Sequence, residues 1–93
     1  MSVTVRVPTI LRTYTDGQAE VSVAPDVETL SGVLTALEVV APGIGARVLD
    51  DEGKLRRFVN IYVDDDDVRF LEGLDTPTPD GTSVSVIPAV AGG

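Results

Sequence analysis

Valine and isoleucine recur at every second position in several short stretches, and this alternation constrains the fold more than any other feature of the sequence. In the first stretch, Val3, Val5 and Val7 are separated by polar residues. A period of two is typical of a β-strand with one buried face. The pattern predicts strands at residues 3–7, 20–23, 58–63 and 83–87. Asp16 and Gly17 favour a turn, so we expect the first two strands to form an antiparallel hairpin with a longish loop.

Only one stretch has the spacing of an amphipathic helix. Its apolar residues recur at intervals of three and four and are Leu30, Val33, Leu34, Leu37 and Ala41. Thr29 precedes them and can cap the helix by accepting a hydrogen bond from an early backbone amide. Pro42 disfavours helical geometry at the residue before it, and Gly43 lets the chain turn away. The sequence therefore predicts one main helix that ends at Ala41.

The remaining segments complete the predicted topology. Residues 43–57 are polar and punctuated by glycine, which indicates a loop with an exposed turn at 50–53. Residues 68–71 are expected to form a short strand, and 73–81 a loop. The order of elements is strand, strand, helix, strand, short strand, strand. We therefore expect an α+β fold in which the main helix packs on one face of a mixed five-stranded sheet.

Length and composition exclude several classes of function. A chain of 93 residues fits one domain, and the formal charge of -8 disfavours binding to phosphate backbones or anionic lipid and favours a basic partner surface. Cysteine and histidine are absent from the sequence, so no disulfide, no usual zinc site and no catalytic histidine is expected. We expect no metal, no bound cofactor and no nucleic acid. With no long apolar run and no signal-like start, the expected location is the cytoplasm, without a membrane contact.

The last residues, Ala89 to Gly93, have the properties of a tail that another protein uses. If extended, they reach about 16 Å, which is enough to enter a partner's active site while the folded body stays outside. Gly92 and Gly93 lack side chains, so the terminal carboxyl group can pass a narrow channel. A terminal carboxylate is ionised at neutral pH and is a poor electrophile until an enzyme activates it, for example as a mixed anhydride with AMP. We expect a domain at 1–88 and a flexible tail at 89–93.

The stretch IYVDDDDVRFLEGLDTPTPDGTSVSVIPAVAGG, taken with the order of elements, resembles the ubiquitin-like sulfur carriers, the family of the molybdopterin synthase small subunit and the thiazole sulfur carrier. The resemblance covers nearly the whole chain and implies a ubiquitin-like β-grasp fold. Residues 46–63, ARVLDDEGKLRRFVNIYV, are similar to longer, actinobacterial members that supply sulfur for cysteine synthesis. Two turns depart from the family pattern, at 64–67 and at 82–83, and they bear on partner choice more than on fold.

The resemblance also implies a chemical role for the tail. An E1-like enzyme would adenylate Gly93, and sulfur would then replace AMP to give a terminal thiocarboxylate. The implied partners further include a pyridoxal-phosphate-dependent cysteine synthase and a metalloprotease that releases the new cysteine. ATP and pyridoxal phosphate would belong to these partners. The alternatives are a molybdopterin synthase small subunit, a protein modifier joined through Gly93 to lysines, and a docking domain with an idle tail.

Other residues are assigned from the same patterns. Val90, Ala91 and Gly92 are expected to give the tail its access to a partner's active site. Alternation places Ile87 outward at the root of the tail, and relatives carry an apolar residue there against their enzymes, so we expect it to dock. Tyr62 also points outward and extends this patch or packs across strands. The aspartates at 64–67 lack the spacing of a calcium loop and indicate a solvated turn.

Overall fold

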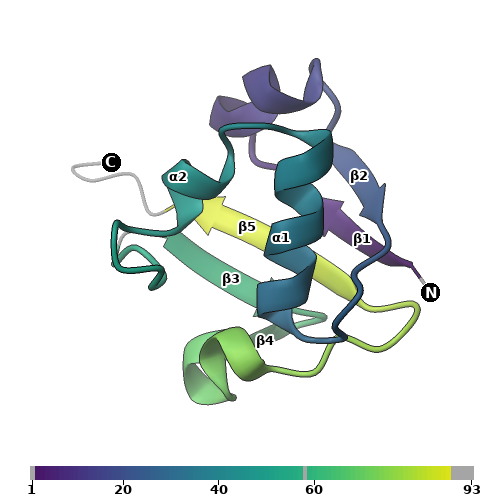
Figure 1. The fold of residues 1–93 in the computed structure, drawn as a ribbon, viewed down its shortest axis with the longest axis vertical. Coiled ribbons are helices and arrows are strands. Elements are labelled where there is room, and N and C mark those ends of the chain that lie inside the picture. Colours follow the sequence, from purple (N-terminus) through teal and green to yellow (C-terminus); the bar gives the residue numbers. More distant parts are fainter. Residues whose placement is uncertain (1, 58, 89–93) are drawn as a thin grey trace.

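The computed structural model describes residues 2–57 and 59–88, and the tail residues Ala89 to Gly93 therefore lie outside it. Figure 1 shows a single sheet with the main helix lying across one of its faces. The helices and strands are β1 (Val3–Arg6), β2 (Glu20–Val23), α1 (Leu30–Val40), α2 (Gly45–Val48), β3 (Val59–Val63), β4 (Asp66–Asp67) and β5 (Ser83–Pro88). Three 3-10 helices join them, at Thr9–Thr15, Val68–Phe70 and Gly73–Asp75.

The sheet has five strands in the order β2-β1-β5-β3-β4. The β1 and β5 strands are parallel, with Val5 opposite Val84, and the other neighbouring pairs are antiparallel. The predicted hairpin is confirmed, because Val3 lies opposite Val23 in an antiparallel pair. The mixed five-stranded sheet with one main helix is therefore confirmed, and β5, which leads to the tail, lies in its centre.

One core lies between α1 and the sheet. Leu30, Val33 and Leu37 on the helix are fully buried, as predicted from their spacing. They meet the inward valines of the strands, including Val5 and Val84, which are also completely buried. Burial of such side chains contributes roughly 1.5–3 kcal/mol each, so this layer is the main source of stability.

Both ends of α1 follow the predicted chemistry. The side chain of Thr29 accepts a hydrogen bond from the backbone N–H of Gly32 at 3.3 Å. At the other end, Ala41 is the C-cap and Gly43 has a φ of 98°, which lets the chain reverse. The carboxylate of Glu38 then accepts hydrogen bonds from the N–H groups of Gly43 and Gly45, at 2.7 and 2.8 Å. Glu38 therefore fixes the start of α2 to the end of α1.

Two predicted segments differ in the structure. The prediction of a loop over 43–57 was wrong in part: it contains α2, and Ile44 and Val48 are completely buried against the core. The prediction of a strand at 68–71 was wrong, because β4 occupies Asp66–Asp67 and a 3-10 turn follows. The cause is the Asp67 side chain, which accepts a hydrogen bond from the N–H of Arg69 at 2.8 Å and caps the turn.

Two connections also contain more structure than predicted. The loop between the first two strands is a 3-10 helix over Thr9–Thr15, which buries Leu11 and Thr15. The loop at 73–81 begins with the 3-10 turn Gly73–Asp75. The exposed turn predicted at Asp50 to Gly53 is confirmed: Asp51, Glu52 and Gly53 are exposed, and the Asp50 side chain accepts from two backbone N–H groups.

Candidate functional site

The root of the tail is the end of β5, and two neighbouring strands hold it. Pro88 lies opposite Val59 and Ile87 opposite Asn60 on β3, while Ser85 lies opposite Arg6 on β1. The β5 strand is held on both sides as far as Ser85, and its last two residues pair with β3, so the point from which residues 89–93 continue is fixed to the sheet. The residues predicted to be modified or to give access, Gly93, Gly92, Ala91 and Val90, lie outside the described residues.

The side chains around this root lie on the face of the sheet opposite α1. We call this the open face, and near the root it consists of Arg6, Asn60, Tyr62, Ser85 and Ile87. Successive side chains of a strand point to opposite faces, and the intervening residues Val84 and Val86 are buried. The sequence correctly predicted that Ile87 points outward: its side chain is 48% exposed. Tyr62 is half-buried; docking by either residue stays a prediction.

A shallow hollow of about 270 Å³ adjoins Ile87 on the side of β1. Arg6, Val7, Pro8 and Ser85 contribute to its lining. The guanidinium of Arg6 lies 3.3 Å from the carboxylate of Glu20, and both side chains are largely exposed. The root of the tail thus offers an exposed apolar side chain next to a cation.

Arg69 fixes the segment that precedes β3, and sequence reasoning did not identify it. Its guanidinium donates to the carbonyl oxygens of Arg56, at 3.1 Å, and Val59, at 2.7 Å, and to the Oδ1 atom of Asn60. These acceptors come just before and within the strand that pairs with Pro88. No sequence signal marks this role, because the contacts join residues that are far apart along the chain.

The perturbed pKa values belong to the segment around α2. Hydrogen bonds from the N–H groups of Gly43 and Gly45 lower the pKa of Glu38, and those from Lys54 and Glu52 lower the pKa of Asp50. A hydrogen bond to the Tyr14 hydroxyl, at 2.8 Å, raises the pKa of Arg47. All three groups are charged near neutral pH, and their partners show that they stabilise local structure.

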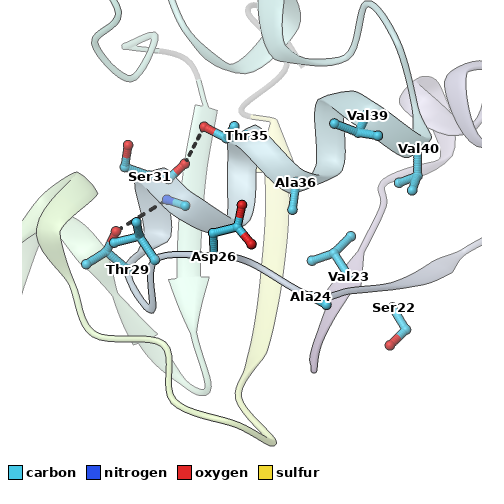
Figure 2. A pocket seen from close by; sticks show the side chains of 12 residues that line it. Ser22, Val23, Ala24, Asp26, Thr29, Ser31, Thr35, Ala36, Val39 and Val40 are labelled. Atoms are coloured by element: carbon cyan, nitrogen blue, oxygen red, sulfur yellow. Dashed lines mark hydrogen bonds between the residues drawn. The ribbon is translucent and has the colours of Figure 1, made fainter. Parts of the chain in front are cut away.

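A larger groove of about 540 Å³ lies between α1 and the segment that leads into it from β2 (Figure 2). Small apolar side chains line it, among them Val23, Ala36 and Val39. Asp26 is the one ionisable group among its lining residues, and no hydrogen bond joins the Asp26 carboxylate to the serine and threonine hydroxyls that also line the groove.

The described residues offer little else for chemistry. Across 2–57 and 59–88, no group of three or more acidic side chains is placed to hold a metal ion. Within the same ranges, no helix has the length and hydropathy needed to span a membrane.

A sequence model of the ThiS family matches residues 5–93. The chain belongs to the ThiS family. The sulfur carrier protein CysO of Mycobacterium tuberculosis (strain H37Rv) is 55% identical over 95 residues, which cover all of both chains. The resemblance to the ubiquitin-like sulfur carriers is thereby confirmed.

Solved structures of ThiS-like relatives share the fold. The Amycolatopsis orientalis chain in a structure described as a BexX/CysO complex matches with a TM-score of 0.87 at 45% identity, covering 98% of this chain and 99% of that one. The crystal structure of Mycobacterium tuberculosis CysO gives a TM-score of 0.86 at 51% identity, over 95% and 99% of the two chains. The ubiquitin-like β-grasp architecture is therefore confirmed.

Proposed function

We propose that this chain is a sulfur carrier protein whose terminal Gly93 is converted to a thiocarboxylate by partner enzymes. The observation that carries the proposal is the match to the ThiS family, which extends through Gly93, together with the full-length similarity to a sulfur carrier protein. The chain is a protein co-substrate and not a catalyst. The domain at 1–88 presents the tail, and 89–93 enters the partner.

The proposed chemistry begins at the ionised carboxylate of Gly93. An E1-like enzyme supplies ATP, and the carboxylate attacks its α-phosphate, which releases pyrophosphate and leaves an acyl adenylate. A sulfur donor then displaces AMP, so a C–S bond replaces a C–O bond. Gly92 and Gly93 add no side chain to the reacting end, and Val90 and Ala91 bridge the distance to it. The sequence has no cysteine, so the chain itself has no thiol that would compete for the activated tail.

The favoured use of this sulfur is cysteine synthesis. The similarity to CysO, at 55% identity over the whole length, supports this pathway over the molybdopterin route. A pyridoxal-phosphate-dependent synthase would accept the sulfur on a carbon skeleton derived from O-phosphoserine, and a metalloprotease would cut the new cysteine from Gly93. Both cofactors, ATP and pyridoxal phosphate, are held by the partners, and all of these steps are placed in the cytoplasm.

Mass spectrometry of the intact protein tests this proposal. Purified protein is incubated with ATP, an E1-like activator and a sulfide source, and we expect a mass change of one oxygen-to-sulfur exchange. The product is then offered to the synthase with O-phosphoserine, where an extension by one cysteine is expected. An unchanged mass would refute the carrier role. Stable binding to a molybdopterin synthase large subunit would favour the role of a molybdopterin synthase small subunit over cysteine synthesis. Isopeptide adducts on target lysines would favour the role of a protein modifier.

A further inference from the structure

The directions of the strands define two ends of the molecule with different charge. Because β5 runs parallel to β1 and antiparallel to β3, the residues Arg6, Val59 and Pro88 lie at one end of the sheet. We call this the tail end. Val3, Val63 and Ser83 lie at the other, which we call the far end. Figure 1 shows α2 beside the tip of β5, at the tail end.

All seven basic residues of the chain belong to the tail end. Arg6 is the last residue of β1, and Arg12 follows in the adjoining 3-10 helix, where its side chain donates to the carbonyl of Val7 at 3.1 Å. Arg47 lies on α2 and is joined to Tyr14. The remaining basic residues are Lys54, Arg56 and Arg57, which lie just before β3, and Arg69, whose side chain reaches back to the same segment.

The acidic residues are distributed differently. The far end carries the four aspartates at 64–67, with Asp64 donating its N–H to the carbonyl of Ser83, and Asp80, which accepts from the N–H of Ser2. Asp26 and Glu28 lie there too, because β2 ends at Val23 and the carbonyl of Glu28 is bonded to Thr78. The far end is strongly negative, and it holds no basic residue.

Acidic residues at the tail end are partly occupied by local contacts. Glu20 pairs with Arg6, and Glu38 and Asp50 accept hydrogen bonds from backbone N–H groups. The others there are Asp16, Asp51 and Glu52, whereas Glu72 and Asp75 belong to the 3-10 turn before Thr76, whose carbonyl accepts from the N–H of Leu30 at the start of α1. The tail end thus carries six acidic and seven basic residues, so its formal charge is close to neutral or slightly positive, while the chain as a whole has a formal charge of -8. The charge separation makes the molecule a strong electric dipole along the strands.

Four arginines at the tail end, Arg12, Arg47, Arg56 and Arg69, donate to neutral acceptors rather than to carboxylates. Arg69 is bonded to backbone carbonyls and to an amide oxygen, Arg56 donates to the carbonyl of Ala46 at 3.0 Å, and Arg47 donates to a hydroxyl. Within residues 2–57 and 59–88, the one ion pair is that between Arg6 and Glu20. A guanidinium bound in this way is fixed in position and keeps its full charge available for a carboxylate on a partner.

We propose that the tail end docks on a partner protein whose tail-binding channel is bordered by carboxylates, and that the negative far end points away. The inference rests on the proposed function, because it assumes that the tail enters a partner. Complementary charges would orient the carrier before contact and speed its association. The net charge alone favours a basic partner surface, and the arrangement of the charges reverses that expectation at the tail end.

Charge reversal at each end tests the proposal, with the E1-like activator as the partner. Arg57→Glu changes the charge by two units at the tail end; the Arg57 side chain is exposed, and it makes no hydrogen bond or ion pair with the described residues. Asp65→Lys is the matched variant at the far end and is equally exposed. Association rate constants are measured by stopped-flow fluorescence at low and at high ionic strength, after circular dichroism has confirmed that both variants fold.

Arg57→Glu is expected to slow association at least about threefold at low salt, and the loss should shrink at about 1 M salt, where the Debye length is only about 3 Å. Asp65→Lys should change the rate much less. Equal and opposite effects of the two variants would show that net charge alone matters, and a faster Arg57→Glu variant would show that the partner surface is basic; either overturns the proposal. The wild-type oxygen-to-sulfur exchange is measured in the same preparation, so failure of the carrier role is recognised separately.

Discussion

Gly32 lies inside α1, and its replacement by alanine should destabilise the protein although alanine is the better helix former. In an exposed helix the change from glycine to alanine stabilises by about 1 kcal/mol. Here a Cβ atom on Gly32 would lie 2.9 Å from the carbonyl carbon of Val27 and closer still to its oxygen. Carbon atoms in contact prefer about 3.5–4.0 Å, so the backbone before the helix would have to move.

The expected cost follows from these distances. Forcing extra atoms into a packed site typically costs about 1–3 kcal/mol, and here the obstacle is backbone rather than a flexible side chain. We therefore take the upper part of that range, about 2–3 kcal/mol, and subtract the gain in helix propensity of about 1 kcal/mol, so Gly32→Ala is expected to lower the free energy of unfolding by about 1–2 kcal/mol. For a domain of this size, that corresponds to a fall in Tm of about 5–15 °C.

Thermal unfolding followed by circular dichroism measures this effect. The matched control is Ser31→Ala, one residue earlier in the same helix at an exposed position, where the change should be within about 0.5 kcal/mol. A Tm of Gly32→Ala equal to or above that of the wild type would refute the reasoning, because it would mean that α1 does not approach Val27 as described.

Substitutions at three other sites test separate features of the structure. The hydroxyl of Thr78 is buried without a hydrogen-bond partner among the described residues, so Thr78→Val should raise the free energy of unfolding by about 1 kcal/mol in urea denaturation; a loss of stability would show that the hydroxyl has a partner. The pKa of Glu38 is lowered in the folded protein, so its carboxylate stabilises the fold above the ordinary pKa of glutamate, and this contribution is lost as the pH falls through the folded value. Glu38→Gln should therefore lower Tm at pH 7, and the difference from the wild type should narrow as the pH falls below the ordinary pKa of glutamate; a constant difference would contradict the assignment. Ile87→Asp should weaken binding to the activator about tenfold with little change in Tm, whereas Val27→Asp, at a 59% exposed site at the far end, should leave binding nearly unchanged; equal effects would argue against docking through Ile87.

The main strands and the main helix were predictable because their burial is periodic in the sequence. The alternating valines of β1 and β5 face the core, and the helical stripe from Leu30 to Leu37 faces the sheet. Each pattern is local and needs no knowledge of the partner strand. The cap at Thr29 and the end of the helix before Pro42 were predictable for the same reason.

The segments that were missed depend on tertiary contacts. Ile44 and Val48 are buried because Glu38 binds the backbone at the start of α2, and the sequence between 43 and 57 has too few apolar residues to show a period. The two-residue strand β4 ends where the Asp67 side chain caps a turn, so four consecutive aspartates contain both a strand and a cap. Such side-chain contacts with the backbone override propensity and leave no repeated pattern.

The site was predictable in part. Alternation along 83–87 correctly placed Ile87 outward, whereas the reacting end at Gly92 and Gly93 stays a prediction. The role of Arg69 was not predictable, because it binds carbonyl groups that only the fold brings near it. The charge separation was hidden for a similar reason, since it depends on the parallel pairing of β1 with β5.

The central claim is that a fixed domain presents a carboxyl end without side chains to another protein's active site. Its most direct test compares the wild type with a variant that carries one phenylalanine added after Gly93, each given ATP, the E1-like activator and sulfide. Intact-mass spectrometry should show oxygen-to-sulfur exchange in the wild type and none in the extended variant. Equal exchange in both would contradict the claim.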